Sequence, residues 1–514
     1  MSQMLHAGPV HVRYEQGFLR YFTHANTEIL RLIYFAIRDH NWTTAPFTIQ
    51  NESITQHAET FQIHYDWQID DLGIQMTGSV VMMGDEKGTI SVDFSGKALN
   101  SFRKNRIGLC ILHPIDGVLG HPAQVVAPDG TQTDAHFPTF IKPHQPFLNI
   151  QTLRWKPASG LTWQLDVEGD VFETEDQRNW SDASFKTYST PQVRPKPVTV
   201  SAGDEFRQRV VFSLADEKLM APADEEKIRE LTQFAAKTKP CQPRVGVGYH
   251  MGGPALTDAE VILLRKLNLS HLRVDVFFSL ANWQELFGQA LADAKRLAIP
   301  LELALFFGTE PTRELKSIQQ FIETQAGVIQ TILLFDASTL RTSDELLAAV
   351  VPAVRNAWPE AAIGGGTDDN FAELNRNPFN FEQVDFVTYS VSPLVHALDD
   401  LTLFENLAGQ AETVLSARKL SGGKPIHISP ITLRLRFKTL EGTATERLDA
   451  PADPRQITDF GADWTRQSLD TLARAGVESV TYFQTHGPGG LVSGDTGYPV
   501  FHVLASNQLV PERK

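Results

Sequence analysis

The stretch Glu173–Tyr188 brings many ionisable side chains together with two large aromatic ones, Trp180 and Phe185. A solvated loop usually carries glycine, proline and serine, and a core strand alternates polar with apolar residues, so the stretch is typical of neither. One interpretation is that the rings hold a loop whose polar groups converge on a ligand, because binding sites combine apolar walls with a few placed polar groups. The alternative is a domain-docking loop whose charges pair with one another, since ion-pair networks imitate sites. The candidate substrate-binding residues of this stretch are Glu175, Asp176, Arg178, Asn179, Asp182 and Lys186.

A second set of candidates follows from alternation in two short segments of the C-terminal half. Over residues 271–277 the apolar side chains take every second position, which turns Arg273 and Asp275 to the other face of a strand. Over residues 301–306 the same pattern turns Glu302 to that face. Arg273 and Glu302 are either functional or a structural pair, because a buried charge needs a partner. We expect Asp275 and Glu302 to be the catalytic carboxylates.

Further polar residues stand where other short apolar segments of this half end. In a (β/α)8 barrel the active site lies at the C-terminal ends of the strands and in the loops that follow them. These residues are therefore expected to gather at one mouth of a barrel, although His427 is equally explained as an inward-facing core histidine. The expected substrate-binding residues are His250, Asp336, His396 and Gln484, and the other polar residues of that mouth are Asp368, Asp369 and His486.

The elements that would position these side chains alternate between short apolar runs and amphipathic helical patterns from Val245 onward. Their spacing of about 25 to 35 residues is that of a βα repeat. Eight strand–helix units are what a (β/α)8 barrel needs, so residues 244–514 are predicted to form a TIM-type barrel. A doubly wound sheet is the alternative, but no G-x-G-x-x-G follows the first strand. The expected strands are 245–250, 271–277, 301–306, 331–336, 362–366, 384–391, 425–431 and 479–485.

Residues 1–215 consist mainly of alternating or apolar segments separated by Gly, Asp and Pro, which predicts an all-β sandwich. Residues 27–39 are ambiguous between helix and strand. Residues 216–243 are charged and helical in pattern and end in prolines, so they are expected to be a helical linker. The predicted fold class is a multidomain protein of α+β and α/β type, with an N-terminal β-sandwich followed by a (β/α)8 barrel.

The chain has 514 residues, and 46 Lys and Arg against 61 Asp and Glu give a formal net charge of −15. This acidity argues against nucleic acid and anionic membrane surfaces as partners. The basic run Arg434–Lys438 alternates like one face of an exposed strand. No apolar run has the length of a membrane span, and no signal-peptide pattern stands at the N-terminus. With Cys110 and Cys241 as the two cysteines, these features predict a cytoplasmic protein with free thiols.

Several common chemistries lack their motif in the sequence. It contains no G-x-S-x-G nucleophile elbow, no H-E-x-x-H, no C-x-x-C and no Walker A sequence. No spacing of His and Asp demands a metal ion, so neither a metal nor a cofactor is expected. Retaining glycosidases on barrels usually place carboxylates on strands 4 and 7, but the seventh expected strand offers His427 and Ser429.

Four stretches of the chain resemble the D-apionate lactonases, bacterial enzymes that open D-apionolactone in the catabolism of the branched sugar apiose. They are E-D-Q-R-N-W-S-D-A-S-F-K-T-Y (175–188), L-R-L-I-Y-F-A-I-R-D-H-N-W (30–42), G-T-D-D-N-F-A-E-L-N-R-N (366–377) and S-V-S-P-L-V-H-A-L-D (390–399). The resemblance implies an N-terminal β-domain, a TIM-type barrel and cytoplasmic carbohydrate catabolism. It also implies a Glu at the end of the last barrel strand, where this chain has Gln484, and a small C-terminal β-domain.

These features together predict a hydrolase that opens a sugar-acid lactone to the aldonate. Lactone hydrolysis needs a base that activates water and donors for the developing oxyanion. Asp275 or Glu302 would be the base, and Arg178 or Lys186 would stabilise the oxyanion. One alternative is a glycoside hydrolase-like enzyme with its carboxylates in unusual positions. Another is a non-catalytic sugar-acid binding protein, which Gln484 favours because an amide cannot act as a base.

Overall fold

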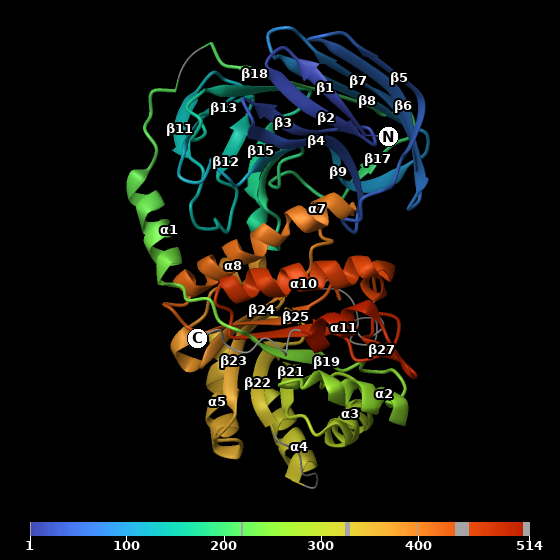
Figure 1. The fold of residues 1–514 in the computed structure, drawn as a ribbon, viewed down its shortest axis with the longest axis vertical. Helices are drawn as coiled ribbons and strands as arrows, with labels where there is room; N and C mark the ends of the chain where they lie inside the picture. The colour runs from blue at the N-terminus through green and yellow to red at the C-terminus, as the bar shows by residue number, and fades with distance from the viewer. Residues whose placement is uncertain (1, 217–218, 324–328, 397, 437–451, 507–514) are drawn as a thin grey trace. The chain divides into compact units, whose positions relative to one another are not determined.

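The computed structural model describes residues 2–216, 219–323, 329–396, 398–436 and 452–506 of the chain (Figure 1). The chain forms two compact units. The first comprises Met1–Gln177 and Ser184–Gln233, and the second comprises Arg178–Ala183 and Phe234–Lys514. A short segment of the N-terminal half therefore belongs to the C-terminal unit.

The first unit contains two nine-stranded sheets, drawn in blue to green in Figure 1. Phe35 of one sheet packs on Trp67 and Phe94 of the other, with ring centroids 5.1 and 5.0 Å apart, so the two apolar faces share one core. The predicted all-β sandwich is confirmed. The strands of the first sheet are, in order across it, β1 (Ser2–Ala7), β2 (Val10–Glu15), β3 (Phe18–His24), β4 (Thr27–Asp39), β9 (Phe102–Pro114), β16 (Ser184–Tyr188), β15 (Phe172–Asp176) and β12 (Phe147–Ile150), with β17 (Val198–Val200) paired to β9. The strands of the second are β11 (Gln132–His136), β10 (Pro122–Val126), β13 (Thr152–Trp155), β14 (Trp163–Glu168), β18 (Glu205–Leu214), β8 (Ile90–Ala98), β7 (Ile74–Gly84), β6 (Phe61–Asp71) and β5 (Thr48–Gln56).

The ambiguous segment 27–39 forms a strand, β4, which pairs antiparallel with β3 and β9. Its β-branched and aromatic residues, such as Ile33 and Phe35, favour an extended backbone, and the neighbouring strands satisfy its backbone hydrogen bonds. Tertiary pairing therefore decides between the two interpretations that periodicity left open.

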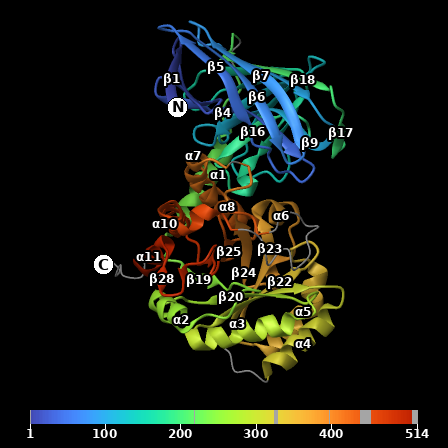
Figure 2. The same ribbon diagram turned by 90° about the vertical axis from the view of Figure 1, so that its right-hand side faces the viewer.

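The second unit contains a closed barrel of eight parallel strands, and the predicted (β/α)8 barrel is confirmed. Figures 1 and 2 show helices packed around the outside of these strands. Each expected strand is present, with ends that differ by a few residues. The strands are β19 (Arg244–Gly248), β20 (Leu272–Phe277), β21 (Leu301–Phe307), β22 (Ile329–Asp336), β23 (Ala362–Asn370), β24 (Phe386–Val391), β25 (Ile426–Ile431) and β26 (Ser479–Phe483).

Helices connect the barrel strands, and a short hairpin of β27 (Val492–Ser493) and β28 (Thr496–Gly497) follows the last one. The α-helices are α1 (Glu225–Lys237), α2 (Asp258–Leu264), α3 (Trp283–Leu297), α4 (Pro311–Glu323), α5 (Asp344–Ala357), α6 (Phe371–Arg376), α7 (Asp400–Glu405), α8 (Leu407–Leu420), α10 (Asp459–Arg474) and α11 (Pro499–Ser506). Single 3-10 turns are η1 (Gln177–Trp180), η2 (Arg265–Leu267), η3 (Phe381–Gln383) and η4 (Pro454–Ile457).

The barrel lumen is apolar on one side. Alternate residues of β20 to β24 form a buried hydrophobic cluster, in which the rings of Phe277 and Phe306 stack with centroids 4.1 Å apart. This cluster occupies the inward positions of the same strands that carry Arg273, Asp275 and Glu302, as their alternation predicted. The polar residues of these strands therefore share the lumen with an apolar wall.

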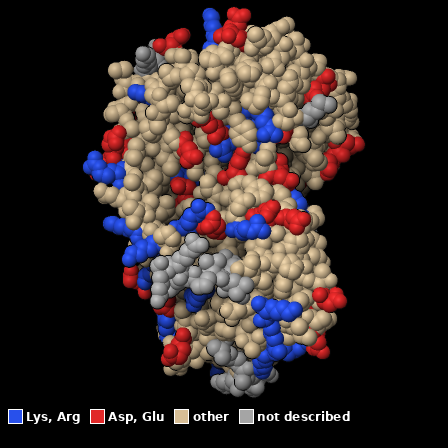
Figure 3. All heavy atoms as spheres, viewed as in Figure 1, with Lys and Arg blue, Asp and Glu red and all other residues tan. Residues whose placement is uncertain are grey.

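On the face seen in Figure 3, basic and acidic residues are interspersed and do not form one extended basic area. None of the described helices is both long and apolar enough to cross a membrane. Cys110 is buried and Cys241 is exposed, and both thiols are free, as predicted.

Candidate functional site

Two carboxylates and two guanidinium groups meet in the barrel lumen, toward the C-terminal ends of the strands. Arg273 Nε donates to Asp275 Oδ1 at 2.9 Å, and its Nη2 bonds to Asp368 on β23. Arg436, which follows β25, bonds to Asp275 through Nη2 and lies 3.5 Å from Asp368 Oδ2 through Nη1. Its guanidinium also lies over the ring of Phe483, 4.2 Å from the centroid. Both aspartates are buried, so each guanidinium bridges two carboxylates away from water.

The surroundings move the pKa values of the two aspartates in opposite directions. Burial alone would raise the pKa of Asp275, but Arg273 and Arg436 outweigh it and lower that pKa below its ordinary value. Burial raises the pKa of Asp368, and the same two arginines offset this only in part while the charge of Asp275 adds to it. One carboxylate is thus held ionised and the other is the better proton acceptor.

Glu302 lies one layer nearer the N-terminal ends of the strands, in register with Arg273. Its carboxylate accepts hydroxyl hydrogen bonds from Ser429 at 2.5 Å, Thr481 at 3.2 Å and Thr331 at 3.4 Å. Ser429 Oγ in turn accepts from Arg273 Nη1 at 3.0 Å. Arg273 and Glu302 are therefore joined through Ser429, on the side of the cluster that faces the N-terminal ends of the strands.

The stretch Glu173–Tyr188 is divided between the two units, and its segment Arg178–Ala183 lies on helices of the barrel unit. The segment comes close to α8, where a Cβ added at Gly409 would lie 2.3 Å from the Ser181 carbonyl oxygen. Arg178 pairs with Glu412 of α8 at 2.8 Å. The close approach of the segment to α8 therefore requires glycine at position 409, and the ion pair of Arg178 with Glu412 joins the segment to the same helix.

The other polar residues of this segment also have partners in the barrel unit. Asp182 pairs with His396 Nδ1 at 2.6 Å and accepts from Asn406 at 2.6 Å. Asn179 accepts from Asn375 of α6 at 3.0 Å. The structure thus brings together four of the predicted substrate-binding residues, namely Arg178, Asn179, Asp182 and His396. The charges of Arg178 and Asp182 pair with Glu412 and His396, and a role of this segment in binding substrate stays a prediction.

The remaining predicted residues of the stretch belong to the first unit. Lys186 pairs with Glu175 across β15 and β16, and both side chains are buried. Asp176 accepts from the backbone N–H of Lys142 at 3.1 Å. These three residues lie on the sandwich.

Asp336, at the end of β22, caps the turn that follows it. Its Oδ1 accepts from the backbone N–H and the hydroxyl of both Ser338 and Thr339. Burial would raise the pKa of Asp336, but these hydrogen bonds lower it. Its Oδ1 is therefore occupied by hydrogen bonds from the loop, and a substrate would have to bind Oδ2.

His250 stands at the start of the loop after β19, and its ring is packed between two glycines. A Cβ added at Gly253 or Gly487 would lie 2.4 or 2.5 Å from its Nδ1. Its backbone N–H donates to Thr485 Oγ1 at 3.2 Å, next to the half-buried Gln484. The backbone of His250 is thus joined to the residue that follows Gln484, where the first and last barrel strands end.

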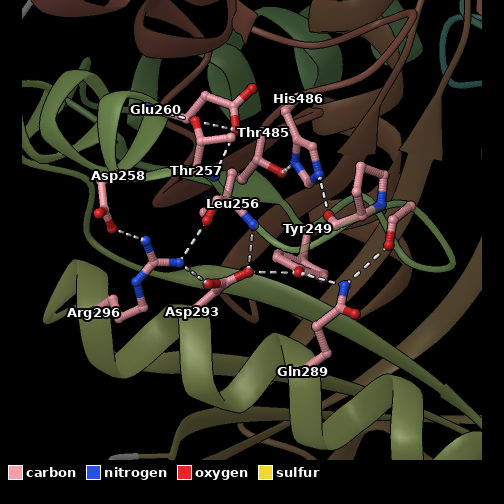
Figure 4. A network of polar contacts seen from close by, with 12 residues as sticks. Tyr249, Leu256, Thr257, Asp258, Glu260, Gln289, Asp293, Arg296, Thr485 and His486 are labelled. Carbon is pink, nitrogen blue, oxygen red and sulfur yellow. Dashed lines mark hydrogen bonds and ion pairs between the residues drawn. The ribbon is translucent and has the colours of Figure 1, made fainter. Parts of the chain in front are cut away.

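A polar network centred on Asp293 of α3 holds the same loop (Figure 4). Asp293 accepts from Tyr249 Oη at 2.7 Å, from the N–H of Leu256 at 2.9 Å and from Arg296 at 2.6 Å. His486 Nε2 lies 2.7 Å from the Pro254 carbonyl oxygen, which ties the loop to the end of the last strand. The buried carboxylate therefore fixes both ends of the segment that carries His250.

We expect Asp293→Ala to lower the free energy of unfolding by about 2–3 kcal/mol, because buried donors lose a charged acceptor. Asp258→Ala is the matched control, since Asp258 pairs with the same Arg296 but its side chain is 98% exposed. Asp258→Ala should lower the free energy of unfolding by no more than about 0.5 kcal/mol. Urea unfolding measures both. Equal losses would mean that Arg296, and not the network around Asp293, carries the effect.

Asp368 and Arg436 are the site residues that sequence reasoning did not assign. The sequence predicts Asp368 at the mouth without assigning it a role, and the two-residue period of its strand, which puts positions 366 and 368 on one face, is the available signal. The interpretation of Arg434–Lys438 as an exposed strand is wrong for Arg436, whose side chain is 12% exposed and paired with two aspartates. Phe437 and Lys438 lie outside the described residues. Within the described part of the chain, no group of three or more His, Cys, Asp or Glu residues is arranged to hold a metal ion.

Comparisons with known proteins cover both units. The chain matches the family description "D-apionate lactonase, N-terminal domain" over residues 1–217 and "D-apionate lactonase, TIM barrel domain" over residues 245–510. A D-apionate lactonase from Brucella anthropi is 30% identical over an alignment of 512 residues, which covers 96% of this chain and 83% of that protein.

Solved structures are more distant. A Cellulomonas fimi endo-beta-1,4-mannanase double mutant matches with a TM-score of 0.35 and 12% identity over 55% of this chain and 73% of that one. The alpha-galactosidase from Lactobacillus brevis matches with a TM-score of 0.28 and 10% identity over 99% and 82%. Similarities at these scores carry no argument. The family matches and the B. anthropi relative do: the chain belongs to the D-apionate lactonase family.

Proposed function

We propose that this protein hydrolyses a D-apionolactone-like sugar lactone to the open-chain aldonate. Membership of the D-apionate lactonase family and the B. anthropi relative support this activity. The observation within the structure that supports it best is the buried pair Asp275 and Asp368, which share two arginines and have pKa values displaced in opposite directions. Paired groups whose surroundings separate their pKa values are typical of acid–base sites. A role in cytoplasmic carbohydrate catabolism is part of the same proposal.

The proposed reaction starts with water attacking the lactone carbonyl carbon. Asp368, the carboxylate with the raised pKa, accepts the proton of that water. The carbonyl oxygen becomes an oxyanion, and the guanidinium N–H groups of Arg436 and Arg273 donate to it. The ring C–O bond then breaks, and the leaving alkoxide takes the proton back from Asp368. The products are a hydroxyl and a carboxylic acid, which ionises and releases one proton to the solvent.

Asp275 is proposed to stay ionised throughout and to hold both guanidinium groups in place. Its lowered pKa suits this role better than the role of a general base, because a carboxylate with a lowered pKa accepts a proton from water less readily. Glu302 would act through Ser429, as a group that positions Arg273. The prediction that Glu302 is itself the base remains untested.

Substrate hydroxyls need hydrogen-bonding groups around the reacting carbon. The residues proposed for this are those near the barrel mouth and those of the segment Arg178–Ala183, namely His250, Asp336, His396, Gln484, Arg178, Asn179 and Asp182. The parts of Glu175, Asp176 and Lys186 in binding substrate, and of Lys186 in stabilising the oxyanion, stay predictions.

A proton-release assay across a panel of aldonolactones tests the proposal. We expect saturable release with D-apionolactone, one proton per lactone opened, and an undiminished rate in the presence of a chelator. Aryl glycosides serve as the parallel panel for the glycoside hydrolase alternative. Turnover of aryl glycosides alone would replace the proposal by that alternative. Saturable lactone binding without turnover would indicate a binding protein.

A further inference from the structure

A group of buried cations lies on the first sheet of the sandwich, outside the barrel and its proposed chemistry. At its centre is Arg106 of β9, which is 3% exposed. Its guanidinium lies 3.7 Å from the centroid of the Tyr188 ring and 5.5 Å from that of Trp42. The two rings cover faces of a planar group whose N–H donors all point outward in its plane.

The donors of Arg106 lack acceptors among the residues that the structure describes. Its Nε is buried without a hydrogen-bond partner, and Arg106 forms no ion pair within the described chain. Burial would lower the pKa of Arg106, but the charge of Glu175 outweighs it and raises that pKa, so the guanidinium stays charged. The buried Nε–H has nevertheless lost its hydrogen bond to water without gaining an acceptor, which is costly. The edge of this guanidinium can therefore bind a hydrogen-bond acceptor from a ligand.

The surrounding charges leave a positive excess. Arg38, the cross-strand neighbour of Arg106, is buried, and so is Lys186. Glu175 pairs with Lys186, and although burial would raise the pKa of Glu175, Lys186 and Arg106 keep it below its ordinary value. Glu173 accepts from Tyr188 Oη and from the N–H of Gln192.

Three buried cations thus face two carboxylates, each of which already has its own partner. A fourth cation, Lys196, lies over the Trp42 ring at 5.6 Å. Lys196 is exposed to solvent, so the buried group by itself has one positive charge in excess, which a single negative charge would balance. A monocarboxylate fits this need better than a phosphate, which carries nearly two charges near neutral pH.

We propose that the Arg106 cluster, consisting of Arg106, Arg38, Lys186, Tyr188 and Trp42, binds the carboxylate group of a small monocarboxylic acid. The two oxygens of a carboxylate match the fork of N–H donors along a guanidinium edge. Trp42 and Tyr188 supply flat apolar surface beside it. The cluster draws on residues 30–42 and 175–188, two of the stretches singled out in the sequence, and the barrel chemistry uses neither Arg106 nor Trp42.

The test uses ¹⁹F NMR of the full chain labelled with 5-fluorotryptophan. The chain has eight tryptophans, and Trp42→Phe identifies the resonance that lies beside Arg106. Sodium gluconate and sodium acetate are the carboxylate probes, with sodium phosphate and sodium chloride at matched ionic strength. We expect a saturable shift of the Trp42 resonance with a Kd on the order of 1 mM for gluconate or acetate. Binding of gluconate alone would show that hydroxyl groups are recognised as well.

Arg106→Gln is expected to raise that Kd by about tenfold or more, since the bidentate contact is lost. If Arg106→Gln does not fold by circular dichroism, Arg106→Lys serves instead, because it keeps the charge and loses the planar fork. Asp368→Asn should leave the Trp42 shift unchanged, so failure of lactone hydrolysis and failure of this site are separate results. A shift with phosphate only, a shift equal to that with chloride, or an unchanged Kd in the Arg106 variants would overturn the proposal.

Discussion

Asp368→Asn is expected to lower kcat for lactone opening by about 10²–10⁴-fold, the usual contribution of a general base. The amide keeps the shape of the side chain and one acceptor, but it cannot take a proton. Burial raises the pKa of Asp368, so the kcat/KM of the unaltered enzyme should fall as the pH drops through that raised value. The variant should lack this acid limb. Initial rates of proton release between about pH 4 and pH 8 measure both effects.

Asp385→Asn is the matched control for this variant. Asp385 lies at the opposite end of the barrel, where it pairs with Arg355 at 2.7 Å and accepts from the N–H of Ile363 at 2.7 Å. The same chemical change there should leave kcat within about threefold of the unaltered rate. If Asp368→Asn also stays within that range while Asp275→Asn loses activity, Asp275 is the base. If neither loses activity, the carboxylate pair is not the catalytic site.

The barrel could be predicted from the sequence because the alternation that marks each strand is a local pattern. The alternation of Leu272, Val274 and Val276 with Arg273 and Asp275 follows from the two-residue period of a strand, and the structure keeps that alternation. The same holds for Glu302, which needed no knowledge of distant residues to be placed in the lumen. Periodicity reports the face on which a side chain lies, and it reports nothing about the partner that it meets there.

For that reason the sequence could not predict which side chains become partners across the lumen. Arg436 and Asp275 are 161 positions apart, and a short basic run after a strand carries no mark that distinguishes a surface segment from one that turns inward. The raised pKa of Asp368 depends on burial and on Asp275, so it too is a property of the folded barrel. The division of Glu173–Tyr188 between two units has the same origin, since ion pairs to Glu412 and His396 decide where Arg178 and Asp182 lie.

Arg273→Met is expected to cost the barrel about 3–5 kcal/mol of its free energy of unfolding near pH 7.5, because two buried carboxylates lose the cation that they share. The loss should shrink near pH 4.5. With Arg273 present, Asp275 has a lowered folded-state pKa, so its contribution is present above the unfolded-state value and is lost as the pH falls. Without Arg273, burial dominates and both folded-state pKa values rise. The contribution of these carboxyl groups to stability is then present at a pH below the unfolded-state pKa of about 3.9, and it is lost as the pH rises through the raised folded-state pKa. Urea unfolding at the two pH values measures the difference.

Arg355→Met separates this effect from the general cost of removing an arginine. Arg355 also pairs with an aspartate, but its side chain and that of Asp385 are 38% and 42% exposed. Water solvates Asp385 when its partner is removed, so the loss should be about 0–1 kcal/mol and nearly independent of pH. A similar small and flat loss for Arg273→Met would mean that water reaches Asp275 and Asp368 in the folded barrel. The raised pKa of Asp368, on which the proposed base depends, would then lose its cause, because it rests on burial.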